Sequence, residues 1–314
     1  MKQALQILVL FALATGVAHA QAQMPVADLD YAPPIPHPAF PQQSGPVVRI
    51  DEAHHNYHTV DGRYAAFANL LRRDGFRVEA SKSELSQQAL VDTGVLVIAN
   101  AEAAQTPAQS TNGVVSAFSD SEISALHEWV KRGGSLLLIA DHPPFSDSAT
   151  ALAKAFGFEF ISGVALSAPV APGQFSPLAV FDTGKGLMPT TLSRGRFPTE
   201  QVDSVMTFTG AAFKAPTAAT PVLVFQDGAL AFRAGPMGPD WTAPGVPIAG
   251  SSQGAILELG KGRVAVFGEA AMFTAQRSGP KGEPMGMNAP AANQNYQFVL
   301  NLMHWLSRAK ELRE

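Results

Sequence analysis

One short stretch of the sequence concentrates side chains suited to proton transfer or metal binding. Directly behind the β-branched run at residues 47–50, the stretch 51–58 contains Asp51, His54, His55 and His58. Imidazole nitrogens and carboxylate oxygens are the usual non-thiolate ligands of zinc, and histidine also exchanges protons near neutral pH. We therefore predict that this stretch forms one wall of a functional site.

Two other segments place polar side chains immediately after apolar runs. Asp141 and His142 follow the run 135–140, and Glu269 follows the run 263–267 after a single glycine. If these runs are parallel strands, their carboxyl ends lie at one edge of the sheet, where open α/β folds place their ligands. The predicted catalytic residues are therefore His54, His58, Asp141, His142 and Glu269.

Two kinds of chemistry are consistent with this set. Asp51, His54, His55 and His58 could supply the three protein ligands that a catalytic divalent metal such as zinc requires, with water in the fourth position. Without a metal, one histidine could act as a general base while a carboxylate orients it. The residue types alone leave both alternatives open.

Structural interpretations compete with the chemical ones. His54 or His55 could cap the following helix or bond to the backbone of a turn, and Asp141 could be a helix N-cap before two prolines. Glu269 could pair with Arg63 or Arg263. Arg194 and Arg196 could reach over the cleft toward an anionic substrate, or they could be solvated loop charges.

The elements that would position these residues follow an alternating order. Apolar runs at 47–50, 76–79, 94–99 and 135–140 are typical of buried strands. Apolar residues at helical spacing predict a helix that begins at Thr59 or Asp61 and ends at Gly75. The sequence from Ser119 to Glu122 matches a capping box, and a glycine pair at 133–134 closes the helix that it opens. This order predicts a doubly wound, mostly parallel α/β sheet of the flavodoxin or amidotransferase type.

The second half of the chain is less regular. A helix is expected over 148–156. From about 162 to 254 glycine and proline become frequent, which predicts a β-rich insertion within a single domain spanning 47–314. Two strands at 255–259 and 263–267 flank Gly260-Lys261-Gly262 and predict a late β-hairpin, and a last helix is expected from about Asn295.

The amino-terminal residues predict export. Residues 1–20 resemble a cleaved signal peptide, with Lys2, an apolar core and Ala18-His19-Ala20 at the end, and 21–46 read as a Pro-rich linker or surface strap. Cleavage would lower the formal net charge from −4 to −5, which offers no electrostatic basis for nucleic-acid binding. No later run is long enough to span a membrane. We expect a periplasmic or secreted protein.

The element order resembles the class I glutamine amidotransferase-like fold over about residues 46–310. Within it, the chain is similar to a cysteine-less, exported branch that includes gliding-protein-like domains and domains of unknown function. In that fold the strand here at 135–140 leads to a nucleophilic cysteine, whose place falls near Asp141 or His142. A later strand carries the catalytic His and Glu; the comparable strand here precedes Glu269 and no histidine. Because the chain contains no cysteine, cysteine-dependent glutaminase activity is excluded.

These observations lead to two functional hypotheses. In the first, the His and acid residues form an active cleft that hydrolyses a carbohydrate or related small substrate, with or without a metal. In the second, the chain is a non-catalytic ligand-binding or scaffolding domain of the cell envelope. The Pro-rich segment also favours an envelope protein partner.

Overall fold

The computed structural model describes residues 25–104, 115–171, 173–235, 238–279 and 281–309. The predicted signal peptide at 1–20 lies outside these residues. No described helix combines the length and the apolar character needed to cross a membrane.

Five parallel strands form the centre of the molecule. In space they run in the order β3, β2, β4, β5, β18, whereas in sequence they follow the order of their numbers. From β2 the chain adds β3 on one side, and it then adds β4 and β5 on the other side, with all strands parallel. The position between β2 and β4 is therefore a topological switch point, as in flavodoxin-like folds. Every residue of β4 and β5 is buried, which explains their unbroken apolar sequences. The strands are β2 (Val47–Asp51), β3 (Arg77–Ser81), β4 (Val95–Ala99), β5 (Ser135–Ile139) and β18 (Gly262–Phe267).

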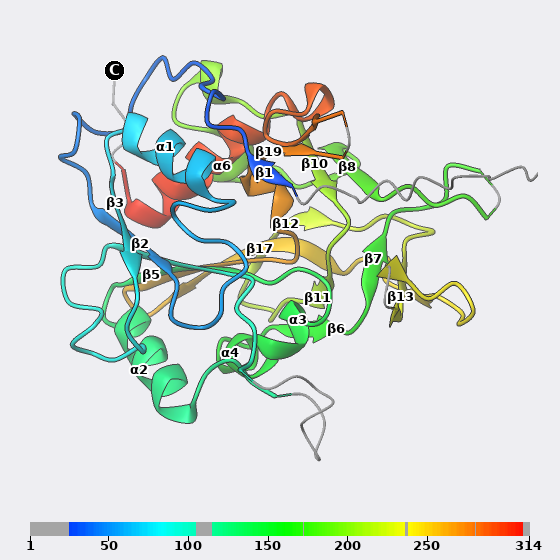
Figure 1. The fold of residues 1–314 in the computed structure, drawn as a ribbon, viewed down its shortest axis with the longest axis horizontal. Helices are drawn as coiled ribbons and strands as arrows, with labels where there is room; N and C mark the ends of the chain where they lie inside the picture. The colour runs from blue at the N-terminus through cyan, green and yellow to red at the C-terminus, as the bar shows by residue number, and fades with distance from the viewer. Residues whose placement is uncertain (1–24, 105–114, 172, 236–237, 280, 310–314) are drawn as a thin grey trace, which may run out of the picture.

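Helices cover both faces of this sheet, which confirms the predicted doubly wound α/β class (Figure 1). One face is covered by α1 (Ala65–Arg73) and α6 (Asn295–Ser307), and the other by α2 (Asp120–Lys131) and α4 (Thr150–Ala155). The predicted capping box of α2 is confirmed: Ser119 Oγ accepts the Glu122 N–H at 3.3 Å, and the Glu122 carboxylate accepts the Ser119 N–H at 3.0 Å.

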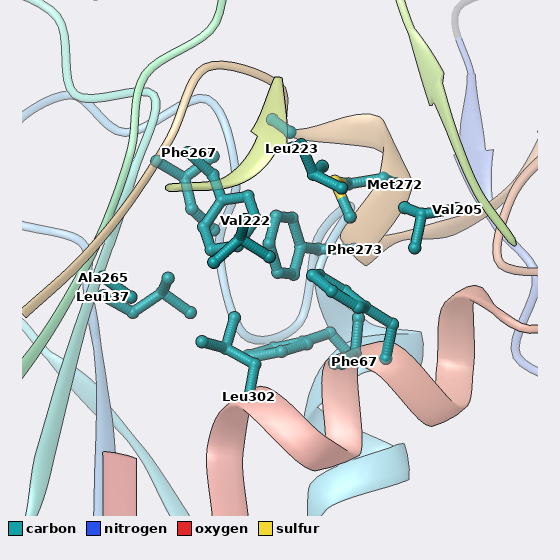
Figure 2. Close-up of a cluster of buried hydrophobic side chains, with 14 of the residues drawn as sticks. Phe67, Leu137, Val205, Val222, Leu223, Ala265, Phe267, Met272, Phe273 and Leu302 are labelled. Carbon is teal, nitrogen blue, oxygen red and sulfur yellow. The ribbon is translucent and has the colours of Figure 1, made fainter. Parts of the chain in front are cut away.

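The core beneath α1 and α6 is rich in aromatic side chains (Figure 2). Phe67 from α1 and Leu302 from α6 pack with Phe273, which belongs to the short 3-10 helix η3 (Ala271–Phe273). Phe267 and Phe273 meet edge to face at 5.3 Å between ring centroids. This packing anchors the segment that directly follows Glu269.

An antiparallel extension continues the sheet beyond β18. The predicted hairpin is confirmed, since β17 (Ser252–Leu259) pairs antiparallel with β18. The region predicted as an insertion at about 162–254 supplies most of the remaining strands of the 12-stranded sheet and two small sheets. The large-sheet strands are β6 (Glu159–Ile161), β8 (Leu178–Thr183), β9 (Gly186–Leu187), β10 (Ser204–Phe208), β11 (Ala212–Lys214) and β12 (Thr220–Val224). The small-sheet strands are β7 (Val164–Leu166), β13 (Leu230–Phe232), β16 (Val246–Pro247), β14 (Ala234–Gly235) and β15 (Gly238–Pro239).

The described part of the Pro-rich segment crosses the face that carries α1. Its strand β1 (Val26–Ala27) pairs with β19 (Ala275–Ser278), which in turn pairs with β20 (Glu283–Gly286). Further along, the Pro33 carbonyl accepts a bond from Arg73 at 2.7 Å, and the Ala39 N–H donates to Asp74 at 2.8 Å. These contacts hold the segment against the end of α1.

Four short helical segments complete the description. They are α3 (Phe145–Ser148), α5 (Thr191–Arg194), η2 (Pro198–Glu200) and η4 (Pro290–Ala292).

Candidate functional site

The carboxyl ends of the parallel strands gather polar residues at one edge of the sheet. Asp51 ends β2, Asn100 follows β4, Asp141 follows β5 and Glu269 follows β18. The side chain of Asn100 accepts the Asp141 N–H at 2.9 Å, so the ends of β4 and β5 are directly joined. The sequence analysis did not select Asn100, although it directly follows the buried run of β4 and so has the same kind of placement as Asp141.

Asp141 and Glu269 form a coupled pair of carboxyl groups. Glu269 is fully buried, whereas 13% of the Asp141 side chain is exposed. Burial raises the pKa of both groups, and the negative charge of Asp141 raises the Glu269 pKa further. Two adjacent carboxyl groups in a poorly solvated setting resist losing both protons, so the pair retains a proton above the pH at which isolated acids ionise.

Glu269 also has a structural contact with the chain that follows it. Its two carboxyl oxygens accept the N–H groups of Ala271 at 2.6 Å and Met272 at 2.8 Å, at the start of η3. The alternative in which Glu269 pairs with Arg63 or Arg263 is wrong. Arg63 lies 3.7 Å over the Tyr57 ring, and Arg263 pairs with Glu258 at 3.2 Å.

Tyr64 lies beside the carboxyl pair and was predicted only as a core position of its helix. Its hydroxyl donates to the Ala270 carbonyl at 3.3 Å. Complete burial, together with the charges of Glu269 and Asp141, raises the Tyr64 pKa well above its ordinary value. The phenol is therefore a neutral hydrogen-bonding group next to the acids. Helical apolar spacing concealed this role, because tyrosine suits a core position equally well.

His54 bridges two carboxylates in a separate cluster. Its Nδ1 lies 2.8 Å from Asp51 and its Nε2 lies 2.9 Å from Glu122, on α2. Burial alone would lower the His54 pKa, but the two carboxylates outweigh burial and raise it. The same contacts and several N–H bonds hold the Glu122 pKa at about 2, against the opposing effect of burial. This arrangement fastens the loop after β2 to α2, and it uses both ring nitrogens.

His58 and His55 occupy very different surroundings. His58 is 4% exposed, and burial, with a smaller contribution from Arg63, lowers its pKa to about 3. It is therefore neutral at ordinary pH and packs 4.7 Å from the Tyr64 ring. His55 is exposed and adopts a left-handed backbone conformation, with φ of 49°.

The four residues of the predicted metal site lie in different surroundings. Within the described part of the chain, no three His, Asp or Glu side chains gather in a way that could hold a metal ion. Carboxylates contact both His54 nitrogens, His55 is exposed, and His58 is enclosed beside Tyr64. A zinc-type site at Asp51, His54, His55 and His58 stays a prediction from the sequence.

His142 is an accessible imidazole beside Asp141. Its side chain is 38% exposed, and its Nε2 lies 3.9 Å from Asp141 Oδ1. Its Nδ1 is 3.0 Å from the Pro143 carbonyl, which orients the ring. Of the five predicted catalytic residues, Asp141, His142 and Glu269 thus lie together, and His58 reaches them only through Tyr64. His54 belongs to the cluster with Asp51 and Glu122.

Comparison with known proteins gives structural likenesses only. No family model and no curated protein sequence matches the chain. The structure is similar to the mmIFT52 N-terminal domain, with a TM-score of 0.57 and 14% identity over 85% of this chain and 100% of that one. Weaker likenesses include a cytoplasmic protein of Salmonella typhimurium (TM-score 0.49, 14% identity, 83% and 98% coverage). Another is a putative ThuA-like protein from Bacteroides uniformis (TM-score 0.46, 9% identity, 88% and 94% coverage). At these identities the likeness concerns the fold alone.

Proposed function

We propose that the carboxyl edge of the sheet is an acid–base site that hydrolyses a small neutral substrate, such as a carbohydrate. The observation that carries this proposal is the coupled pair of Asp141 and Glu269, in which burial raises both pKa values. A carboxyl group that keeps its proton to higher pH than an ordinary aspartate is better suited to act as a general acid.

The roles follow from exposure. Asp141 is the partly accessible member of the pair and is the candidate catalytic acid, whereas Glu269 is fully enclosed and acts on Asp141 through its charge and proton. In the proposed reaction the one proton that the pair holds is on Asp141 when the substrate binds, and Asp141 gives it to the leaving oxygen as the bond to that oxygen breaks. Water supplies the new bond, and the exposed His142 accepts the proton that the water loses. Asn100 holds the backbone of Asp141 in place.

A panel of neutral chromogenic glycosides and esters, assayed with Asp141→Asn and Glu269→Gln, tests this function. We expect Asp141→Asn to reduce kcat about 100-fold or more, which is the usual contribution of general acid catalysis. Asp147→Asn is the matched control. Asp147 lies on α3, burial also raises its pKa, and its side chain contacts Ser162 and not the coupled pair. It should stay within about twofold of wild type.

A panel without turnover, or an Asp141→Asn variant with full activity, would contradict the enzymatic proposal. The second candidate is then a non-catalytic ligand-binding or scaffolding domain of the envelope. The bonds from Glu269 to the start of η3 favour it, because they give this acid a structural purpose. Saturable sugar binding that is lost in Asp141→Asn, without turnover, would support this candidate.

We also propose that the protein is exported to the periplasm or secreted, on the basis of the signal-like pattern of residues 1–20. Amino-terminal sequencing after cell fractionation tests this. The expected result is a protein outside the cytoplasm that begins at Gln21, and an intact amino terminus in the cytoplasm would contradict it.

A further inference from the structure

A hollow lies at the amino edge of the sheet, where the parallel strands begin, opposite the edge that carries Asp141 and Glu269. A cavity of about 770 Å³ is bounded by Arg263 at the start of β18 and by Trp305 and Arg308 at the end of α6. A neighbouring cavity of about 420 Å³ shares three lining residues with it, Thr191, Glu258 and Trp305. Cavities of this size accommodate small molecules. We name the two together the amino-edge hollow.

The side chains that line the amino-edge hollow carry more positive than negative charge. Arg196 is neutralised by Glu200, to which it bonds through two nitrogens, and Arg263 pairs with Glu258 at 3.2 Å. Within the described parts of the chain, neither Arg194 nor Arg308 has an acidic side chain at salt-bridge distance. Among the described residues, two guanidinium charges along the lining are therefore without an acidic partner.

Backbone contacts hold the guanidinium groups in place without neutralising them. Arg263 lies 4.9 Å over the Trp305 ring and donates to the Trp305 carbonyl. Arg308 donates to the carbonyls of Gly133, at 3.3 Å, and Lys261. These acceptors are neutral, so they leave the charge of Arg308 in place, whereas Arg263 is also paired with Glu258. Groups fixed in this way bind an anion with little further loss of side-chain freedom.

Arg308 is an exposed side chain, and the protein atoms around it act partly against its positive charge. Burial, and then the positive charge of Arg263, lower the Arg308 pKa, while Glu258 opposes them. Guanidinium groups match oxyanions geometrically and bond to them in pairs. A bound oxyanion would remove the repulsion between the two arginines.

We propose that the amino-edge hollow binds a small multivalent oxyanion, held by Arg263 and Arg308 with Arg194 at the adjoining rim. The sequence analysis placed Arg194 and Arg196 over the catalytic cleft or in solvent. The structure places both at the opposite edge from Asp141 and Glu269. Arg194 is exposed, as in the second alternative, whereas Arg196 is largely buried and pairs with Glu200. The site is therefore independent of the acid–base pair.

Isothermal titration of the exported chain with pyrophosphate and with citrate tests the proposal at low ionic strength. We expect saturable binding of at least one probe with a Kd below about 1 mM, no binding of glucose, and weaker binding as salt rises. Preference for pyrophosphate would identify a phosphate-bearing ligand, and preference for citrate a polycarboxylate. Absence of saturable binding of both probes would overturn the proposal.

Three variants sharpen the test. Glu258→Gln removes the acid that competes for Arg263, and it lies on a side chain that is 68% exposed, so the fold should tolerate it. We expect it to tighten binding severalfold, whereas Arg308→Gln should weaken binding about tenfold and Arg194→Gln by less. Asp141→Asn should bind as wild type does. Unchanged or weaker binding by Glu258→Gln would refute the assignment even if Arg308→Gln proves unstable.

Discussion

Two pairs of buried acids lie at the carboxyl edge of the sheet, and they differ in what stands between them. Asp51 and Glu122 are joined by the imidazole of His54, which contacts both. Among the described residues, no imidazole joins Asp141 to Glu269 in this way. His142 lies 3.9 Å from Asp141 and only partly offsets the effect of burial, so the pKa values of both acids rise, whereas the Glu122 pKa falls to about 2. In the first pair the imidazole contacts both carboxylates and holds the loop after β2 against α2. The second must keep a proton, and it can therefore transfer one.

The largest expected effect comes from removing the bridging base. His54→Ala leaves two buried carboxylates facing a cavity, and breaking a buried charge pair typically costs about 3–5 kcal/mol. Urea denaturation at pH 6 measures this loss. His55→Ala is the matched control, because His55 is exposed in the same loop, and its effect should stay within about 0.5 kcal/mol. A His54→Ala variant as stable as the control would mean that the bridge does not fasten the fold.

The next effect is a pH dependence of the folding stability that comes from the unbridged pair, Asp141 and Glu269. Because the folded pKa of Glu269 is raised, the folded state binds more protons than the unfolded state above about pH 4.3, and stability falls as pH rises toward the folded pKa. Glu269→Gln cannot ionise and should lose this decline. At pH 5 the variant should be less stable than wild type, because it gives up one good acceptor for the N–H groups of η3. At pH 8 it should be more stable than wild type by about 1 kcal/mol or more, because wild type then has to ionise Glu269 or keep it protonated.

Denaturation curves of wild type and Glu269→Gln at pH 5 and pH 8 test this expectation. Parallel behaviour of wild type and Glu269→Gln across this range would show that Glu269 ionises normally, and the contrast between the two pairs would fail.

The smallest effect concerns the pH window of the bridged pair. The raised His54 pKa contributes stability that is complete below about pH 6.5 and is lost as pH rises through the folded pKa. The lowered Glu122 pKa contributes stability present above about pH 4.3 and lost as pH falls toward about 2. The bridge should therefore stabilise most between about pH 4.3 and 6.5. His54→Gln should show its greatest loss relative to wild type in this window, measured as ΔTm, and a loss independent of pH would contradict the charge assignment.

Several features were predictable from local sequence. The unbroken apolar runs of β4 and β5, the capping box before α2 and the glycine-rich turn between β17 and β18 each reflect backbone requirements that a few neighbouring residues satisfy. The carboxyl-edge placement of Asp141 and Glu269 followed from strand order, and the structure brings them together.

The partner of His54 could not be predicted from the residues near it in the sequence. Glu122 lies 68 residues from His54 and serves the capping box of its own helix, so nothing in its sequence context indicated a second bond. The histidine cluster was interpreted as a shared ligand set because the types suited a metal. The chain instead turns His54, His55 and His58 to three separate environments.

By itself, the sequence determined the α/β class, the absence of thiol chemistry and the edge of the sheet where the acids lie, because strand periodicity, composition and chain direction are local or additive properties. Only the tertiary structure decided which pair of acids is joined by a histidine and which pair is not. That choice depends on long-range distances and on burial, and these set whether a carboxyl group gives up its proton to a neighbour or keeps it.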